Sequence, residues 1–283
     1  MKRKLFFLIY FSLIILYGCK KNADLQLPYT EPKLVVSSFI TPQDSLIQAA
    51  VSLTEPLYNN QNQSTNYKPL PDAKVEINDG VNSYNLLYNA KLERYVIDSF
   101  KLKIRAGSTY IIEVTTNDGK RAKASTTIPY LNNTLTYSMR KDNAVKTAYY
   151  VTGKWTDNNL QVNTNYMFDV VFTSLSFFSG NNSNGGFNDT IKMRNIHYKM
   201  ANDLEGPNFE KTLDFSIYDT KSDSVYIDLI TVSNEYMNYI NKLGDAVGVL
   251  SNPFSQPVQM YTNVDGGLGI FAGLNRYSLR IFP

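Results

Sequence analysis

The residue types that most often carry out catalysis are scarce in this sequence. His197 is its only histidine, so a Ser-His-Asp triad or a histidine-rich metal site would have to be built on that one residue. It lies in the segment RNIHYKM, whose alternating pattern places it in the middle of a β-strand. We therefore expect a structural or surface histidine there rather than a general base.

A glycine-rich stretch near the C-terminal end, DGGLGIF, has some likeness to a phosphate-binding loop. It lacks the preceding strand, the following helix and the terminal lysine that such a loop needs. Gly266, Gly267 and Gly269 are instead expected to permit positive φ angles and close packing of the backbone.

Two Asn-Asp-Gly triplets, at residues 78–80 and 117–119, could suggest calcium binding. Neither is followed by the spaced carboxylates of a calcium loop, and both fit the turn of a β-hairpin. No pair stands out among the 25 acidic residues, although such pairs can meet in space. The sequence thus predicts no metal, no cofactor and no enzymatic activity.

The N-terminal segment has the charge and hydropathy pattern of a signal peptide. Lys2, Arg3 and Lys4 precede an uncharged apolar run from Leu5 to Leu16. A membrane-spanning helix needs about 18 or more apolar residues, so this run is short for one. We predict a signal peptide over residues 1–18, with a transmembrane anchor as the weaker alternative.

The only cysteine, Cys19, directly follows this segment. Leu16, Gly18 and Cys19 resemble the lipobox that the lipoprotein signal peptidase cuts, although Tyr17 is bulkier than usual. The resemblance implies cleavage between Gly18 and Cys19 and a lipid on Cys19, where the alternative is a spare buried cysteine. Residues 19–32 are then the lipidated N-terminus and a polar tether, which anchors the chain to a bilayer without spanning it.

The charge balance argues against nucleic acid as a partner. Removal of three basic residues with the signal peptide leaves 28 − 3 = 25 basic residues against 25 acidic ones. A formally neutral chain lacks the excess of Lys and Arg that neutralises phosphates. Because Cys19 is the only cysteine, the mature chain can form no intrachain disulfide either.

The remaining chain is predicted to be all-β. Its 21 Tyr and 15 Phe, with many Val, Ile and Thr, favour strands. Residues 33–129 are predicted to form one antiparallel β-sandwich, whose strand and turn pattern resembles the immunoglobulin-like and transthyretin-like modules of secreted proteins. Residues 130–283 are predicted to form a second sandwich with one short helix near 233–243, which Ser233 caps and Gly244 ends.

The most distinctive stretch lies near the C-terminus. Asn252-Pro253-Phe254, Pro257, Asn263 and the glycine-rich segment occur in an order that, with the lipobox, resembles a lipoprotein family of the Bacteroidota, domain of unknown function 4249. This resemblance implies an outer-membrane lipoprotein with a TonB-dependent receptor as its partner, and no known activity. It leaves open whether the chain faces the periplasm or the cell surface, because Lys20 and Lys21 stand where surface-exposed members often have acidic residues.

Two polar segments are the predicted binding loops. One is Glu55–Pro71 with Tyr58 and Tyr67, and the other is Ser174–Thr190 with its three phenylalanines. The phenylalanines are Phe177, Phe178 and Phe187. We expect a non-enzymatic binding or accessory subunit. The alternatives are a lipoprotein that captures a glycan or peptide and, less favoured, a surface hydrolase with two convergent acids in a concave site.

Overall fold

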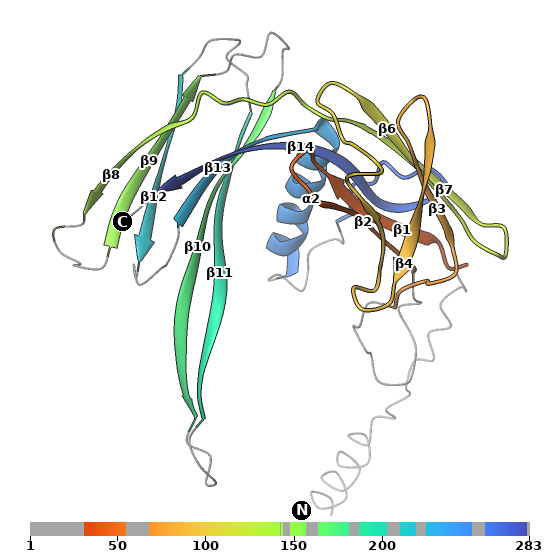
Figure 1. Cartoon of the computed structure of the whole chain (residues 1–283), viewed down its shortest axis with the longest axis horizontal. Helices are drawn as coiled ribbons and strands as arrows, with labels where there is room; N and C mark the ends of the chain where they lie inside the picture. The colour runs from red at the N-terminus through yellow and green to blue at the C-terminus, as the bar shows by residue number, and fades with distance from the viewer. Residues whose placement is uncertain are drawn as a thin grey trace, which may run out of the picture. The chain divides into compact units, whose positions relative to one another are not determined.

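A computed structural model of the chain describes residues 31–54, 68–141, 143, 148–156, 164–180, 187–202, 210–218, 225–250 and 258–281 (Figure 1). All of these except Glu31 belong to one compact unit, made of Pro32–Glu55 and Asn59–Pro283. The elements are β1 (Leu34–Ile40), β2 (Leu46–Leu53), β3 (Lys74–Asn78), β4 (Ser83–Asn89), β5 (Arg94–Asp98), β6 (Thr109–Thr115), β7 (Arg121–Thr127), β8 (Thr136–Lys141), β9 (Ala148–Thr156), β10 (Asn165–Gly180), β11 (Phe187–Asn202), β12 (Glu210–Tyr218), β13 (Val225–Val232), α2 (Asn234–Leu250) and β14 (Gly267–Ile281).

One mixed sheet contains strands from both halves of the chain, residues 33–129 and residues 130–283. Its strand order is β11-β10-β13-β14-β1-β2-β5-β4-β3-β6-β7. A second, three-stranded sheet has the order β12-β9-β8. The predicted fold class of two antiparallel sandwiches is therefore wrong, because a single sheet passes from the first half into the second. The domain limits at 33–129 and 130–283 stay predictions.

The strand that joins the two halves is β14. Its first part, Gly267–Gly273, pairs with β1 in parallel, and its second part, Leu274–Ile281, pairs antiparallel with β13. The sheet also curls, because Lys123 of β7 exchanges two backbone hydrogen bonds with Asp265, just before β14 begins. Local alternation along the sequence cannot show such pairings, since they join segments that lie far apart in the chain.

Backbone and side-chain hydrogen bonds surround β14 where its partner changes. Gly273 N donates to Thr126 Oγ1 at 2.9 Å, and Ser233 N donates to Gly273 O at 3.0 Å. Asn275, which is 2% exposed, donates to Pro129 O at 2.8 Å and accepts from Gln43 Nε2 at 2.8 Å. These hydrogen bonds satisfy backbone groups of β14 and the buried Asn275 side chain at the junction.

Two hydrophobic clusters form the main cores. The first lies among β1–β7 and takes Phe271 from β14. The second lies between the three-stranded sheet and β10, β13 and β14, where Trp155 stacks on Phe168 with ring centroids 5.8 Å apart. Trp155 is 1% exposed and belongs to this second core.

Helix α2 packs on the sheet through the residues of its first turns. Met237 joins Ile230 and Val232 of β13 in a small third cluster. The predicted cap is confirmed, because Tyr236 N donates to Ser233 Oγ at 3.5 Å. The predicted end at Gly244 is wrong, since the helix continues to Leu250. A glycine inside a helix costs only about 1 kcal/mol relative to alanine, so its presence alone does not end one.

The glycine predictions are confirmed for Gly266 and Gly269, whereas Gly267 has no positive φ angle and serves close packing alone, since a Cβ atom on it would lie 2.7 Å from Leu34 O. Gly266 and Gly269 have φ angles of 72° and 112°, and Gly80 and Gly119 of the two hairpin turns have φ angles of 92° and 86°. A Cβ atom on Gly266 would lie 2.3 Å from the backbone oxygen of Arg121. The glycine-rich stretch therefore allows close backbone packing, as expected.

Candidate functional site

A groove lies on the outer face of β1, β2 and β5 and is lined by several polar side chains. Strand alternation turns Leu34 and Val36 of β1 into the core and leaves Ser37 and Phe39 on the other face. The register pairs Ser37 of β1 with Ala50 of β2, and β2 in turn pairs with β5. The groove has a volume of about 310 Å³ and is lined by Ser37, Phe39, Asp44, Gln48, Ala50 and Arg94.

The small side chain of Ala50 leaves the floor of this groove open between Ser37 and Arg94. In the part of the chain that the structure describes, the side chains of Ser37, Gln48 and Arg94 make no hydrogen bond or ion pair. The groove thus offers a hydroxyl, an amide and a guanidinium to a polar ligand.

Phe39 forms one wall of the groove and is 36% exposed. It contacts two aromatic residues of α2, Tyr236 with ring centroids 5.5 Å apart in an edge-on arrangement and Tyr239 at 6.4 Å. These contacts hold the Phe39 ring in place, which suits it to pack against an apolar part of a ligand.

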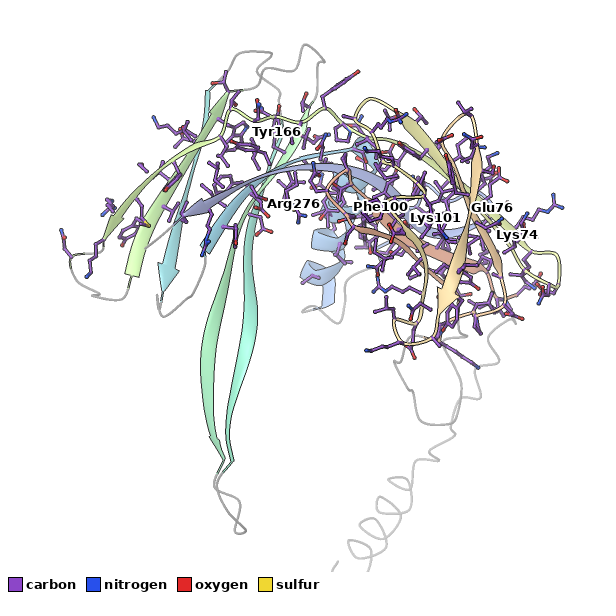
Figure 2. The ribbon with its side chains drawn as sticks, in the orientation of Figure 1. Lys74, Glu76, Phe100, Lys101, Tyr166 and Arg276 are labelled. Atoms are coloured by element: carbon purple, nitrogen blue, oxygen red, sulfur yellow. The ribbon has the colours of Figure 1, made fainter. Side chains whose placement is uncertain are left out.

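Asp44 lies between this groove and a second cavity of about 210 Å³ that includes Thr41, Phe100 and Lys103. Burial raises the pKa of the Asp44 carboxyl above its ordinary value of 3.8, and the nearby Arg276 partly opposes the rise. Arg276 is labelled in Figure 2. The fold therefore disfavours the ionised form of the Asp44 carboxyl.

We expect Asp44→Asn to stabilise the protein at pH 7. A carboxyl whose pKa is raised in the folded state destabilises that state when it is ionised, so the neutral amide removes this cost. The gain should shrink as the pH falls through the folded-state pKa and should be gone below 3.8. Urea unfolding of both proteins from pH 3 to pH 7 measures it.

Asp79→Asn is the matched control with the opposite sign. Hydrogen bonds from Asn82 and Val81 lower the pKa of the Asp79 carboxyl, so the loss of its charge should destabilise the protein at pH 7. A gain from Asp44→Asn that is the same at every pH would contradict the assignment of its origin to ionisation.

A buried pair of acids lies elsewhere in the sheet. The register places Asp169 of β10 directly opposite Asp228 of β13, and the two residues are 6% and 4% exposed. Residues opposite each other on antiparallel strands have Cβ atoms about 5 Å apart. Glycoside hydrolysis needs such carboxyls to reach a substrate and a water molecule, and burial denies both to this pair. Among the described residues, no cluster of His, Cys, Asp and Glu has the composition of a metal site.

The structure describes only some of the predicted site residues. Cys19, Gly18, Tyr58 and Tyr67 lie outside the described residues. His197 lies in the middle of β11, opposite Val170, as predicted.

The segment predicted as a phenylalanine-bearing loop at 174–190 is mostly strand. Phe177 and Phe178 belong to β10 and Phe187 begins β11, so the prediction of a loop there is wrong. Sequence reasoning also missed the groove. The alternating pattern of the sequence predicts that Ser37 and Gln48 face outward. It does not predict that β2 pairs with β5, which brings Arg94 to the groove.

Comparison with known proteins gives one assignment. A family model described as domain of unknown function DUF4249 matches residues 20–280. The chain belongs to this DUF4249 family. The DUF4249 membership expected from the C-terminal stretch is thereby confirmed. No curated protein matches the chain.

Two solved structures have low similarity to this DUF4249 protein. The chitinase ChiA74 from Bacillus thuringiensis is 14% identical with a TM-score of 0.23, over 75% of this chain and 30% of the chitinase chain. An alpha-2-macroglobulin mutant from Salmonella is 8% identical with a TM-score of 0.24, over 95% of this chain and 16% of its own. The DUF4249 chain thus spans less than a third of either protein, and such scores assign it neither fold nor activity.

No described helix has the length and apolar character needed to cross a bilayer.

Proposed function

We propose that this DUF4249 protein is a non-enzymatic lipoprotein of the outer membrane that acts as a binding or accessory subunit of a TonB-dependent receptor. The signal peptide and Cys19 support the lipid anchor. The location and the receptor come from the resemblance to lipoproteins of the Bacteroidota.

One observation carries the binding role, namely the length of the hairpin formed by β10 and β11. The ladder between β10 and β13 ends at the pair Phe172–Val225, whereas the ladder between β10 and β11 continues to Gly180–Phe187. Residues 173–180 and 187–194 thus form a two-stranded extension, which we call the hairpin arm (Figure 1). At about 3.4 Å per residue the arm is about 27 Å long.

The arm has the backbone features of a protein-binding element. In the described part of the chain no third strand pairs with it, so both of its edges present unpaired N–H and C=O groups. A two-stranded ribbon is only marginally stable in water, and a partner strand added to its edge would satisfy these groups. The arm also contains Phe177, Phe178 and Phe187, and aromatic residues are enriched among those that dominate binding energy.

Affinity purification from solubilised outer membranes tests this proposal. In the test variant, residues 175–192 are replaced by Asn-Gly, so that a tight turn joins the paired residues Ser174 and Met193. We expect the full lipidated chain to recover a receptor in stoichiometric amounts, and the variant to lose at least about 90% of it while it keeps its far-ultraviolet circular dichroism. Cys19→Ala should leave the membrane fraction or remain unprocessed, because it cannot carry the lipid.

Arg94→Ala is the control variant, since Arg94 lies in the groove and not in the arm. Receptor recovery that is unchanged by the arm deletion would contradict the proposal. Recovery of a glycan or peptide that depends on Arg94, with no receptor, would instead favour ligand capture through the groove.

A further inference from the structure

The segment that follows β5 presents an aromatic ring to solvent among positive charges. Phe100 is 96% exposed, whereas Leu102 and Ile104, at 0% and 5% exposure, reach into the core. The residues between and after them are exposed cations. We call residues 99–105, with Lys101, Lys103 and Arg105, the Phe100 loop (Figure 2).

Hydrogen bonds fix the backbone of this loop. Phe100 N donates to Asp98 Oδ1 at 2.8 Å, and Lys101 N donates to Asp98 O at 2.9 Å. At its other end, Arg105 N donates to the Tyr110 hydroxyl at 2.8 Å, and that hydroxyl donates to Lys103 O at 3.1 Å. The exposed ring is thus held out by a rigid support, which lowers the entropy that binding would cost.

The cations of the loop differ from other lysines of the same sheet. Lys74 pairs with Glu76 at 2.7 Å and Lys123 pairs with Glu113 at 2.7 Å. Within the described residues, Lys101, Lys103 and Arg105 have no such ion pair.

Acidic residues also lie near the loop. Asp98 uses Oδ1 to cap the Phe100 backbone, and Asp44 lines the cavity of about 210 Å³ beside Phe100. Asp79 also lies close enough to act electrostatically on the Tyr110 hydroxyl that the loop bonds. The preference for an anionic partner therefore rests on the three exposed cations that flank the exposed ring.

The position of the loop relative to the start of the fold matters as well. The described chain begins at Glu31, and β1 then runs to Ile40, next to Thr41 in the cavity beside Phe100. The loop therefore lies about one strand length, roughly 23 Å, from where the tether meets the fold. A segment as long as that between Cys19 and Glu31 spans at most about 40 Å, which is enough for the loop and the lipid to meet one bilayer.

We propose that the Phe100 loop is a second membrane contact, at which Phe100 enters the headgroup layer of an anionic bilayer and Lys101, Lys103 and Arg105 bind its phosphate groups. This inference rests on the lipid anchor of the proposed function. An aromatic ring inserts at the interface while neighbouring cations gain from the negative surface potential. The anchor confines the protein to the surface, and the loop sets the orientation in which it lies there.

A fluorescent label tests the contact on the full lipidated chain in vesicles. Because Cys19 is the only cysteine, Phe100→Cys provides a single free thiol for an environment-sensitive dye of apolar character. We expect its emission to shift to the blue in vesicles of phosphatidylethanolamine and phosphatidylglycerol, and to return in 0.5 M salt. Vesicles of phosphatidylcholine alone should give no shift.

Val81→Cys is the control, because Val81 is 85% exposed on the turn after β3, and its dye should report water in every vesicle. Addition of Lys101→Ser and Lys103→Ser to the labelled Phe100→Cys chain should lower the ratio of docked to undocked protein about 25-fold, at about fivefold per lysine. Lys74→Ser, which removes an ion-paired lysine, should leave the ratio unchanged.

The outcomes separate the loop from the anchor. A dye at position 100 that reports water on anionic vesicles, while the protein floats with them, would overturn the inference and leave the anchor intact. Uptake of dye by the wild-type chain would show an unmodified Cys19 and would overturn the anchor. A blue shift that requires an added membrane protein rather than anionic lipid would assign the loop to a protein partner and overturn the lipid contact.

Discussion

Gly269→Ala is expected to lower the free energy of unfolding by at least about 3 kcal/mol, which is a large part of the stability of a typical domain. The residue has a φ angle of +112°, which an alanine rarely adopts. A Cβ atom there would also lie 2.0 Å from the backbone oxygen of Val36 and 3.0 Å from its nitrogen. Because Val36 lies on β1, directly opposite Gly269, the two strands would have to move apart.

Gly80→Ala separates the two causes of this effect. Gly80 also has a positive φ angle, +92°, but a Cβ atom on it would meet nothing within 4 Å. Gly80→Ala should therefore lower the free energy of unfolding only by the cost of the positive φ angle, about 1–2 kcal/mol. Urea unfolding followed by circular dichroism measures both variants, and equal losses would contradict a clash with β1.

The second large effect is expected in the core beneath the three-stranded sheet. Phe168→Ala should cost about 3–5 kcal/mol, because it empties the space of a buried ring. Phe168 is 0% exposed and stacks on Trp155 with an interplanar angle of 10°. The loss of this stack should also change the near-ultraviolet circular dichroism, since Trp155 is the only tryptophan.

Gly153 of β9 makes this stack possible. A Cβ atom on it would lie 2.2 Å from Phe168 Cζ, so Gly153→Ala alone should cost about 1–3 kcal/mol through overpacking. In the Phe168→Ala background the same change should be neutral or stabilising, because the methyl group then fills vacated space. A double-mutant cycle measures this coupling, and additive losses would show that the two residues do not share that space.

Local structure was readable from the sequence where the physical cause was local. The hairpin at residues 109–127 and its turn glycine follow from alternation and from the need for a positive φ angle. The start of α2 at Ser233 follows from capping chemistry. The pairing of β1 with β14 joins residues more than two hundred positions apart, and no local pattern contains such a register.

The candidate groove could not be predicted from the sequence for the same reason. Ser37 and Arg94 each look like ordinary surface residues, and only the order β1-β2-β5 brings them to one cavity. The glycine and asparagine near Phe177 and Phe178 predict a loop, whereas the pairing of β10 with β11 continues through both residues. The buried acids at 169 and 228 gave no signal, since each lies among apolar residues of its own strand.

The double pairing of β14 has a consequence for biosynthesis. This strand follows every other described strand in the chain, yet Phe271 completes one hydrophobic cluster and Ile281 completes the other. Neither half can reach its native state on the ribosome before this strand emerges. The native packing of both clusters is therefore expected to form only after the last described strand has been synthesised.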